Sequence, residues 1–466
     1  MFEFTTSQYM QIILALSVGI FVFLMGYFMS ERYTVSALIL IIPFQFVASK
    51  YGTANMVLTY LLGVSMILSG KIKGFPFLRW IFFIMLIYML SFSQVHKSTY
   101  VFHLFYLISI FSNFFLFYII YNFTINEDDP KLFINLLIVL NVLVIIYALA
   151  QMIIGFDRLS LFGVEELSVA AGSKIAGSEI RLRGGPFGAI GINAEYLVIQ
   201  SLIMGYLVIY IKEKWEKVLS IGLLSLNVLI LIATGNRGGF FSIIIGSALF
   251  FYFYRKQIGS VRIVAISLAF LLIFAIMSFI TVKYTQYDSL FRRVSETELV
   301  HGMPSNRYGV WTLTFNQFLK KPILGHGPRI HSVPKLKNFQ EMIHYDLMPN
   351  PHNLYLYILY TLGVLGLIAY VAFWGNIYNA FRKTKNKYCD DVLLNNLPRL
   401  GMIILAVFLF DQVKVEFLRY KLTDYQHYIF MLFGAFVGFS HILQKRSEII
   451  VSTSEHEKSL SSREKF

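Results

Sequence analysis

Cysteine and charge are both scarce in this sequence. Cys389 is the single cysteine among 466 residues, which excludes an intramolecular disulfide framework and a cysteine-based metal cluster. Charged residues make up only 14% of the chain, whereas hydrophobic residues make up 57%. A soluble protein this apolar could not cover its surface, so we predict an integral membrane protein without a soluble catalytic domain.

The motifs of nucleotide-dependent and metal-dependent enzymes are also missing. There is no Walker motif, dinucleotide fingerprint, HExxH motif or Asp-rich metal motif. We therefore expect no cofactor, no metal site and no nucleotide-driven transport by this chain alone. The net charge of +14 would indicate a nucleic-acid partner in a soluble protein. In a membrane protein much of it is better interpreted as lysine and arginine that set topology, so no nucleic acid is expected.

Apolar runs long enough to cross a bilayer recur along nearly the whole chain. They predict an all-α, polytopic membrane bundle of about 12–13 helices, the lower number applying if the short second or third is re-entrant. The predicted spans are 10–30, 34–48, 54–69, 77–93, 100–123, 132–155, 189–211, 218–233, 239–254, 263–282, 352–378, 397–410 and 425–443. The first lacks a basic start and a small-residue cleavage site, so it is interpreted as a retained helix.

Basic residues of the short loops indicate the orientation. By parity they fall on one side, which the positive-inside rule assigns to the cytoplasm. They are Lys71, Lys73, Arg79, Lys212, Lys214, Lys217, Arg255, Lys256, Arg262, Arg382, Lys383, Lys385, Lys387, Lys445 and Arg446. We predict a membrane domain over 1–446, an extracytoplasmic loop over 283–351 and a disordered cytoplasmic tail over 447–466.

The outer side nevertheless carries cations, contrary to the topology signal. Those predicted there are Arg158, Arg181, Arg183, Arg237, Arg292, Arg293, Arg307, Arg329, Lys414 and Arg419. Arg237 lies in a tight turn between two spans, at the membrane surface. Arginine is well suited to bind phosphate, so the set indicates a lipid diphosphate presented from the bilayer. Ordinary anionic headgroups are the alternative ligand.

His352 is the candidate general base. Asn350 is a plausible N-cap and Pro351 a good first helical residue, which would place His352 in the first turn at the outer face. The positive end of the helix dipole disfavours imidazolium, and a neutral imidazole there can accept a proton. The alternative is an interfacial histidine that only caps the helix.

Arg307 and Glu195 have more ambiguous patterns. Apolar residues after Arg307 repeat at helical spacing, which predicts an amphipathic helix in the outer leaflet with Arg307 in its first turn. That helix would also suit simple packing. Glycines follow Arg183 and would leave room for a bulky anion. Glu195 begins a span where a carboxylate is costly unless paired, so we expect an outer arginine beside it. Lys414 belongs to a charged outer turn that is interpreted as structural.

Five motifs in a fixed order carry a resemblance to a known family. They are Thr-Gly-Asn-Arg-Gly-Gly at 234–239, Asn-Arg-Tyr-Gly-Val-Trp at 306–311, Pro-Ile-Leu-Gly-His-Gly at 322–327, Pro-His-Asn at 351–353 and Leu-Gly-Val-Leu-Gly at 362–366. Their order and spacing resemble the O-antigen ligase and polymerase superfamily of bacterial membrane glycosyltransferases. The motif-bearing part spans about residues 183–378. Asn236 stands where many members have serine.

The resemblance implies an enzyme of the bacterial inner membrane that works on its outer face. Such enzymes move a glycan from a polyprenyl diphosphate carrier, usually undecaprenyl diphosphate, to an acceptor sugar hydroxyl, without metal or nucleotide. His352 would match the family's proposed base. Arg237 and Arg307 would match the diphosphate-binding arginines, and Arg183 is a looser match. Asn353 and Glu195 are assigned supporting places.

Several hypotheses about the function remain open at this point. As a polymerase the protein would use a second carrier-linked repeat as acceptor, and as a ligase it would use lipid A-core. Polymerase is slightly favoured, because nothing looks tailored to lipid A-core. A transporter or flippase of lipid-linked sugars or small anions would place cations inside a central cavity. A scaffold for other polysaccharide-assembly proteins would not require His352 together with the arginines.

Overall fold

The structure is a computed structural model of the whole chain. It describes residues 17, 19–44, 48–49, 52–95, 100–154, 182, 184–187, 190–259, 272, 275–276, 279, 283, 299–300, 303–327, 351–414, 418 and 423–463. Within these residues, eight helices are long and apolar enough to cross a membrane. They are α5 (Tyr100–Glu127), α6 (Pro130–Ile154), α8 (Ile190–Tyr210), α9 (Lys214–Ala233), α10 (Arg237–Ile258), α15 (Leu354–Thr384), α16 (Val392–Asp411) and α17 (Thr423–Arg463).

Shorter elements complete the described part. The helices are α2 (Glu31–Ile41), α3 (Ala54–Leu68), α4 (Leu78–Ser91), the 3-10 turn η1 (Phe92–Gln94) and α13 (Ser305–Phe318). Two pairs of two-residue antiparallel strands join β1 (Ala48–Ser49) to β2 (Gly52–Thr53) and β3 (Leu299–Val300) to β4 (Met303–Pro304). The predicted all-α, multi-pass membrane bundle is confirmed.

Individual predicted spans differ in length from the observed helices. The span predicted over 34–48 is the 11-residue α2, which ends at Ile41 because Pro43 follows it. At 1.5 Å per residue such a helix covers about 16 Å, roughly half of the hydrocarbon core. The span predicted over 263–282 lies almost entirely outside the described residues.

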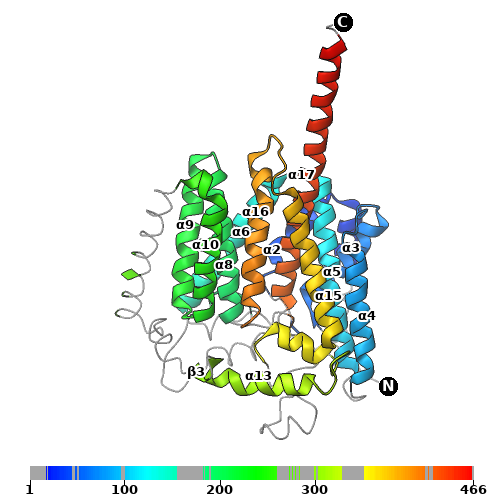
Figure 1. Cartoon of the computed structure of the whole chain (residues 1–466), viewed down its shortest axis with the longest axis vertical. Coiled ribbons are helices and arrows are strands. Elements are labelled where there is room, and N and C mark those ends of the chain that lie inside the picture. The colour runs from blue at the N-terminus through cyan, green and yellow to red at the C-terminus, as the bar shows by residue number, and fades with distance from the viewer. Residues whose placement is uncertain are drawn as a thin grey trace.

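Figure 1 shows most of the long helices side by side, with α13 lying across one end of the bundle. Helix α17 packs against α5 and continues well beyond the bundle at the other end. The tail predicted to be disordered over 447–466 is therefore helical as far as Arg463. The helix passes without proline through this polar stretch, and Gln444 donates a hydrogen bond to Glu448 one turn later (3.0 Å).

Short-loop cations gather at the end of the bundle from which α17 projects, which we call the basic face. Contacts across this end join Arg446 to Asp128 (2.8 Å), Lys131 to Glu216 (3.5 Å) and the Lys71 carbonyl to Asn126 (2.9 Å). The starts of α10 and α15 lie at the opposite end, across which α13 runs, and α13 packs against α15 (Figure 1). We call that end the site face.

Helix α15 is broken near its start by Gly363, whose φ of 68° is outside the helical range. The turn at 322–327 docks against the break. Val364 donates to the Pro322 carbonyl (2.8 Å), and His326 donates through its backbone N–H to the Tyr360 carbonyl (2.8 Å). A Cβ at Gly363 would overlap the Ile323 carbonyl oxygen, so the chain can approach only a glycine there. Two of the motifs found in the sequence are thus the two halves of one backbone junction.

Candidate active site

Arg237 is the first residue of α10, directly after the turn that begins at Thr234. Asn236 is the N-cap, and its side-chain oxygen accepts a hydrogen bond from the Gly239 N–H (2.7 Å). Asparagine and serine are comparably good N-caps, so the departure at Asn236 leaves the start of the helix intact. The partly exposed Arg237 side chain therefore sits where free backbone N–H groups already favour an anion.

Arg307 lies in the first turn of α13, as the sequence predicts. Trp311 follows four residues later on the same face of the helix. Its indole Nε1–H donates to the Pro351 carbonyl at 2.7 Å. This bond joins the Arg307 helix to the residue directly before His352.

His352 lies just outside α15, which corrects the predicted helix start. The N-cap is Asn353, whose side-chain oxygen accepts from the Leu356 N–H (3.1 Å), so neither Asn350 nor Pro351 begins the helix. His352 itself has a φ of 48°, a left-handed conformation that is uncommon outside glycine, and its side chain is exposed. Strained backbone of this kind concentrates at functional sites.

Glu195 is fully buried in the first turns of α8. We expected an arginine beside it, but among the residues that the structure describes its hydrogen-bond partners are others. Gln412 donates to Oε1 (3.1 Å), and the side chains of Asp411 and Tyr425 also contact the carboxyl group. Gln412 also accepts the Leu354 N–H through its backbone carbonyl (2.9 Å). Gln412 thus links α8 to the start of α15.

Lys414, which the sequence places in a charged outer turn, lies beside the start of α10. It forms an ion pair with the buried Asp411, and its Nζ donates to Ser242 Oγ (2.9 Å). Ser242 in turn donates to Asp411 (2.6 Å). A Cβ at Gly238 would lie 2.5 Å from Lys414 Nζ. One signal for this contact is present in the sequence: a lysine near the end of a predicted span, with an aspartate three residues before it.

Arg183 lies outside the described residues, but its neighbour Gly184 is described. A Cβ at Gly184 would lie 2.6 Å from the Thr234 side chain, so this segment runs beside the turn that leads to Arg237. Gly185 is held by Gln151, which both accepts its N–H and donates to its carbonyl (3.2 Å each). The glycines here make room for close contacts with Thr234 and Gln151.

The other loop histidines divide into two groups. His326 is buried, its Nε2 lies 2.8 Å from the Gln317 carbonyl, and its ring stacks on Tyr360. That environment fits a packing role. His331 and His344 lie outside the described residues.

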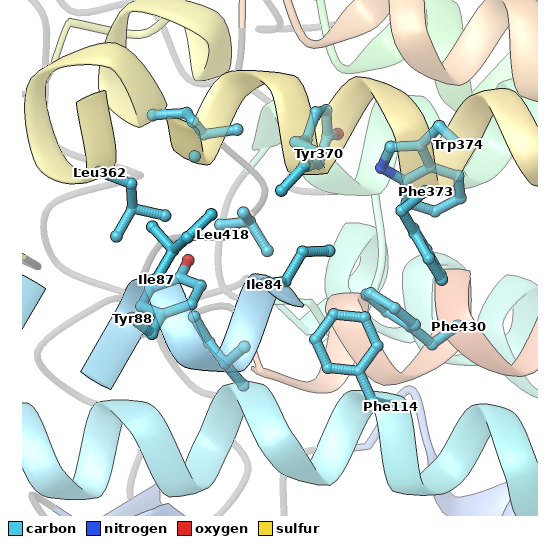
Figure 2. A pocket seen from close by; sticks show the side chains of 14 residues that line it. Ile84, Ile87, Tyr88, Phe114, Leu362, Tyr370, Phe373, Trp374, Leu418 and Phe430 are labelled. Carbon is cyan, nitrogen blue, oxygen red and sulfur yellow. The ribbon is translucent and has the colours of Figure 1, made fainter. Parts of the chain in front are cut away.

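An apolar cavity lies among α4, α5, α15 and α17, next to the break in α15 (Figure 2). Its lining is aliphatic and aromatic, and Leu362, Phe373 and Phe430 are typical. Figure 2 shows Tyr88 and Tyr370 as the labelled lining residues that carry hydroxyl groups. The cavity is unsuited to a charged group, so the candidate site lies instead at the site face.

The protein is a multi-pass membrane protein with a candidate site at one end of its bundle. The contacts described above join the elements that carry Arg237, Arg307 and His352 at this site face. No group of three or more metal-ligating side chains occurs within the described part of the chain. Residues 222–371 match a family model described as O-antigen ligase. This segment covers about a third of the chain and contains all three residues. The match confirms the resemblance to the O-antigen ligase and polymerase superfamily and supports a role in surface-polysaccharide assembly. No curated protein sequence matches the chain.

Proposed function

We propose that this protein transfers a glycan from a polyprenyl diphosphate carrier to a sugar hydroxyl on the outer face of the bacterial inner membrane. The observation that carries the proposal is the hydrogen bond from Trp311 to the Pro351 carbonyl (2.7 Å). It holds the helix of Arg307 against the segment of His352. A contact of this kind is expected where an anion-binding group and a base serve one reaction.

The proposed chemistry is a direct displacement. His352 accepts the proton of the acceptor hydroxyl while the oxygen bonds to the anomeric carbon. The bond from that carbon to the diphosphate oxygen breaks, so the configuration inverts and the carrier diphosphate leaves. Arg237 and Arg307 stabilise the charge that grows on the leaving group, and the α10 N-terminus adds to the same field. Arg183 belongs to the proposed diphosphate set because its neighbour in the sequence, Gly184, lies beside the Thr234 side chain.

The basic face is then cytoplasmic and the site face extracytoplasmic, because cytoplasmic loops carry the excess of lysine and arginine. Asn353 would support His352 by fixing where α15 begins. Glu195 would support His352 indirectly, through Gln412, because Gln412 contacts both Glu195 and the backbone of Leu354.

The test is His352→Ala in a strain that lacks the native gene, with His441→Ala as the matched control on an exposed position of α17. Surface glycans and lipid-linked glycans are separated on gels after membrane expression is confirmed. If long chains vanish and single carrier-linked repeats accumulate, the protein is a polymerase. If long chains remain on the carrier and never reach a final acceptor, it is a ligase. An unchanged profile in a well-expressed variant would refute the proposal.

The arginines are tested separately. Arg237→Gln and Arg307→Gln should each lower transfer by about 10²–10³-fold, the loss typical of removing one donor to a developing oxyanion. Lysine at either position should restore only part of the rate, because a point charge lacks the bidentate geometry. Arg382→Gln, on an exposed position at the basic face, is the control and should leave transfer unchanged.

A further inference from the structure

A second cationic site lies at the basic face, far from the candidate active site. A surface hollow there is bounded by the end of α10, the residues after α15 and the first turns of α16. Its lining includes the four cations Arg255, Lys256, Lys385 and Arg399. Among the described residues that line it, none carries a carboxylate.

Arg399 is the unusual member of this set. It is the eighth residue of α16, about 10 Å along the helix from its first residue, within a candidate membrane span. Its Nη1 donates to the Asn396 side chain at 3.0 Å, one turn nearer the cytoplasmic end. In the described part of the chain, the ion pairs observed do not include Arg399. A cation at this depth is costly unless an anion accompanies it.

The other three cations of the hollow are explained by the helix dipole and by the positive charge expected of cytoplasmic loops. Arg255 and Lys256 lie in the last turn of α10, and Lys385 is the C-cap of α15. Cations at helix C-termini are favoured by the dipole and also set the topology. Arg399 instead lies in the N-terminal half of α16, where the helix dipole gives a cation no benefit. A bound anion would account for Arg399, which the dipole and the topology signal do not.

Position and surroundings identify the chemistry of that ligand. Arg255 lies over the ring of Tyr252, with Cζ 4.9 Å from the ring centroid. Tyr252 is 60% exposed, as expected of an aromatic side chain at the level of the lipid headgroups. Arginine with lysine neighbours, in a hollow whose described lining carries no carboxylate, suits a phosphate group.

We propose that this hollow binds the phosphate of an anionic phospholipid of the cytoplasmic leaflet. Arg399 contacts the phosphate from the side nearer the membrane interior. The cations at the ends of α10 and α15, which are Arg255, Lys256 and Lys385, surround it at the surface. The lipid would act as a bridge that holds α10, α15 and α16 together at the end opposite the active site.

The experiment uses the purified full-length protein in neutral detergent. The thermal unfolding midpoint is measured while phosphatidylglycerol, phosphatidylcholine or inorganic phosphate is added. We expect a saturable rise with phosphatidylglycerol, and little change with phosphatidylcholine or with inorganic phosphate at equal concentration. In Arg255→Gln/Lys385→Gln, the phosphatidylglycerol concentration for half of the rise should increase about 25-fold, at roughly fivefold for each cation.

Lys212→Gln/Lys214→Gln is the matched control, because both residues are exposed cations of the same face outside the hollow. Its titration should equal that of the native chain. Arg399→Lys and Arg399→Gln extend the series, and the double variant keeps the test valid if Arg399→Gln fails to fold. Equal stabilisation by phosphatidylcholine, or an equal loss in the control, would overturn the proposal. A matching response to inorganic phosphate would show a soluble anion site and not a lipid site.

Discussion

The side chain of Lys414 occupies the space beside Gly238, where a Cβ would lie 2.5 Å from its Cδ and its Nζ. Gly238 directly follows Arg237, so the ammonium group lies next to the proposed diphosphate-binding turn. Asp411 is only 1% exposed and pairs with this ammonium. The ion pair thereby fixes the turn, and its carboxylate stays buried and does not compete for the ligand at the surface.

Replacing Lys414 should show how much the ion pair of Lys414 with Asp411 contributes to the stability of the protein. Lys414→Met leaves Asp411 buried without its cation and should destabilise the protein by about 3 kcal/mol, the lower end for breaking a buried pair. The double variant Lys414→Met/Asp411→Asn should recover most of the stability, because position 411 then no longer carries a buried charge without its cation. Thermal unfolding in detergent measures both variants. Equal losses in the single and double variants would show that the pair is not coupled.

The break in α15 gives a second prediction. Gly363→Ala forces the side chain against the Ile323 carbonyl and imposes a left-handed conformation on alanine. We expect loss of long glycan chains and a lower unfolding midpoint. Gly375→Ala is the control in the same helix, since an added Cβ there meets nothing within 4 Å. Comparable effects from the two substitutions would argue against a specific junction at Gly363.

His352 offers a way to separate strain from chemistry. Its φ of 48° costs about 1–2 kcal/mol for an L-residue, and glycine removes that cost. His352→Gly should therefore keep or raise the unfolding midpoint while glycan transfer is lost. His352→Asn tolerates the same conformation and should behave likewise. If His352→Gly instead unfolds the protein, the histidine acts through packing and not as the base.

The sequence predicted the architecture well because hydropathy and charge report directly on burial in lipid. Arg307 in the first turn of α13 followed from helical spacing alone. The predicted N-cap of α15, Asn350, was wrong by three residues. Asn350 and Asn353 are equally good caps by residue type, and only the contacts of Pro351 and Leu354 in the fold decide between them. The partner of Glu195 could not be predicted, because Gln412 lies 217 positions later and pairs with it only through the fold.

Cys389 should be nearly unreactive in the folded protein. It is buried, its Sγ lies 3.7 Å from the Asp391 carbonyl, and burial raises the pKa of its thiol. Because the thiolate is the reactive form, maleimide labelling at pH 7 should be slow and should accelerate as the pH rises. Mass spectrometry of intact protein measures the rate, with denatured protein as the reference. Fast labelling at pH 7 would contradict the buried position.

Trp311 is the position at which loss of a single hydrogen bond should affect catalysis most selectively. Trp311→Phe keeps an aromatic ring on α13 but removes the N–H that reaches the Pro351 carbonyl. The helix of Arg307 would then be held less firmly against His352, and a small misplacement of reacting groups can cost about 10²-fold in rate. We expect a slower transfer with purified carrier-linked glycan and an unchanged pH profile, because the base itself remains. Phe315→Leu, at a half-exposed position of the same helix, should retain near-native rates. A shifted pH profile in Trp311→Phe would mean that the indole influences the protonation of the base and does more than hold two segments together.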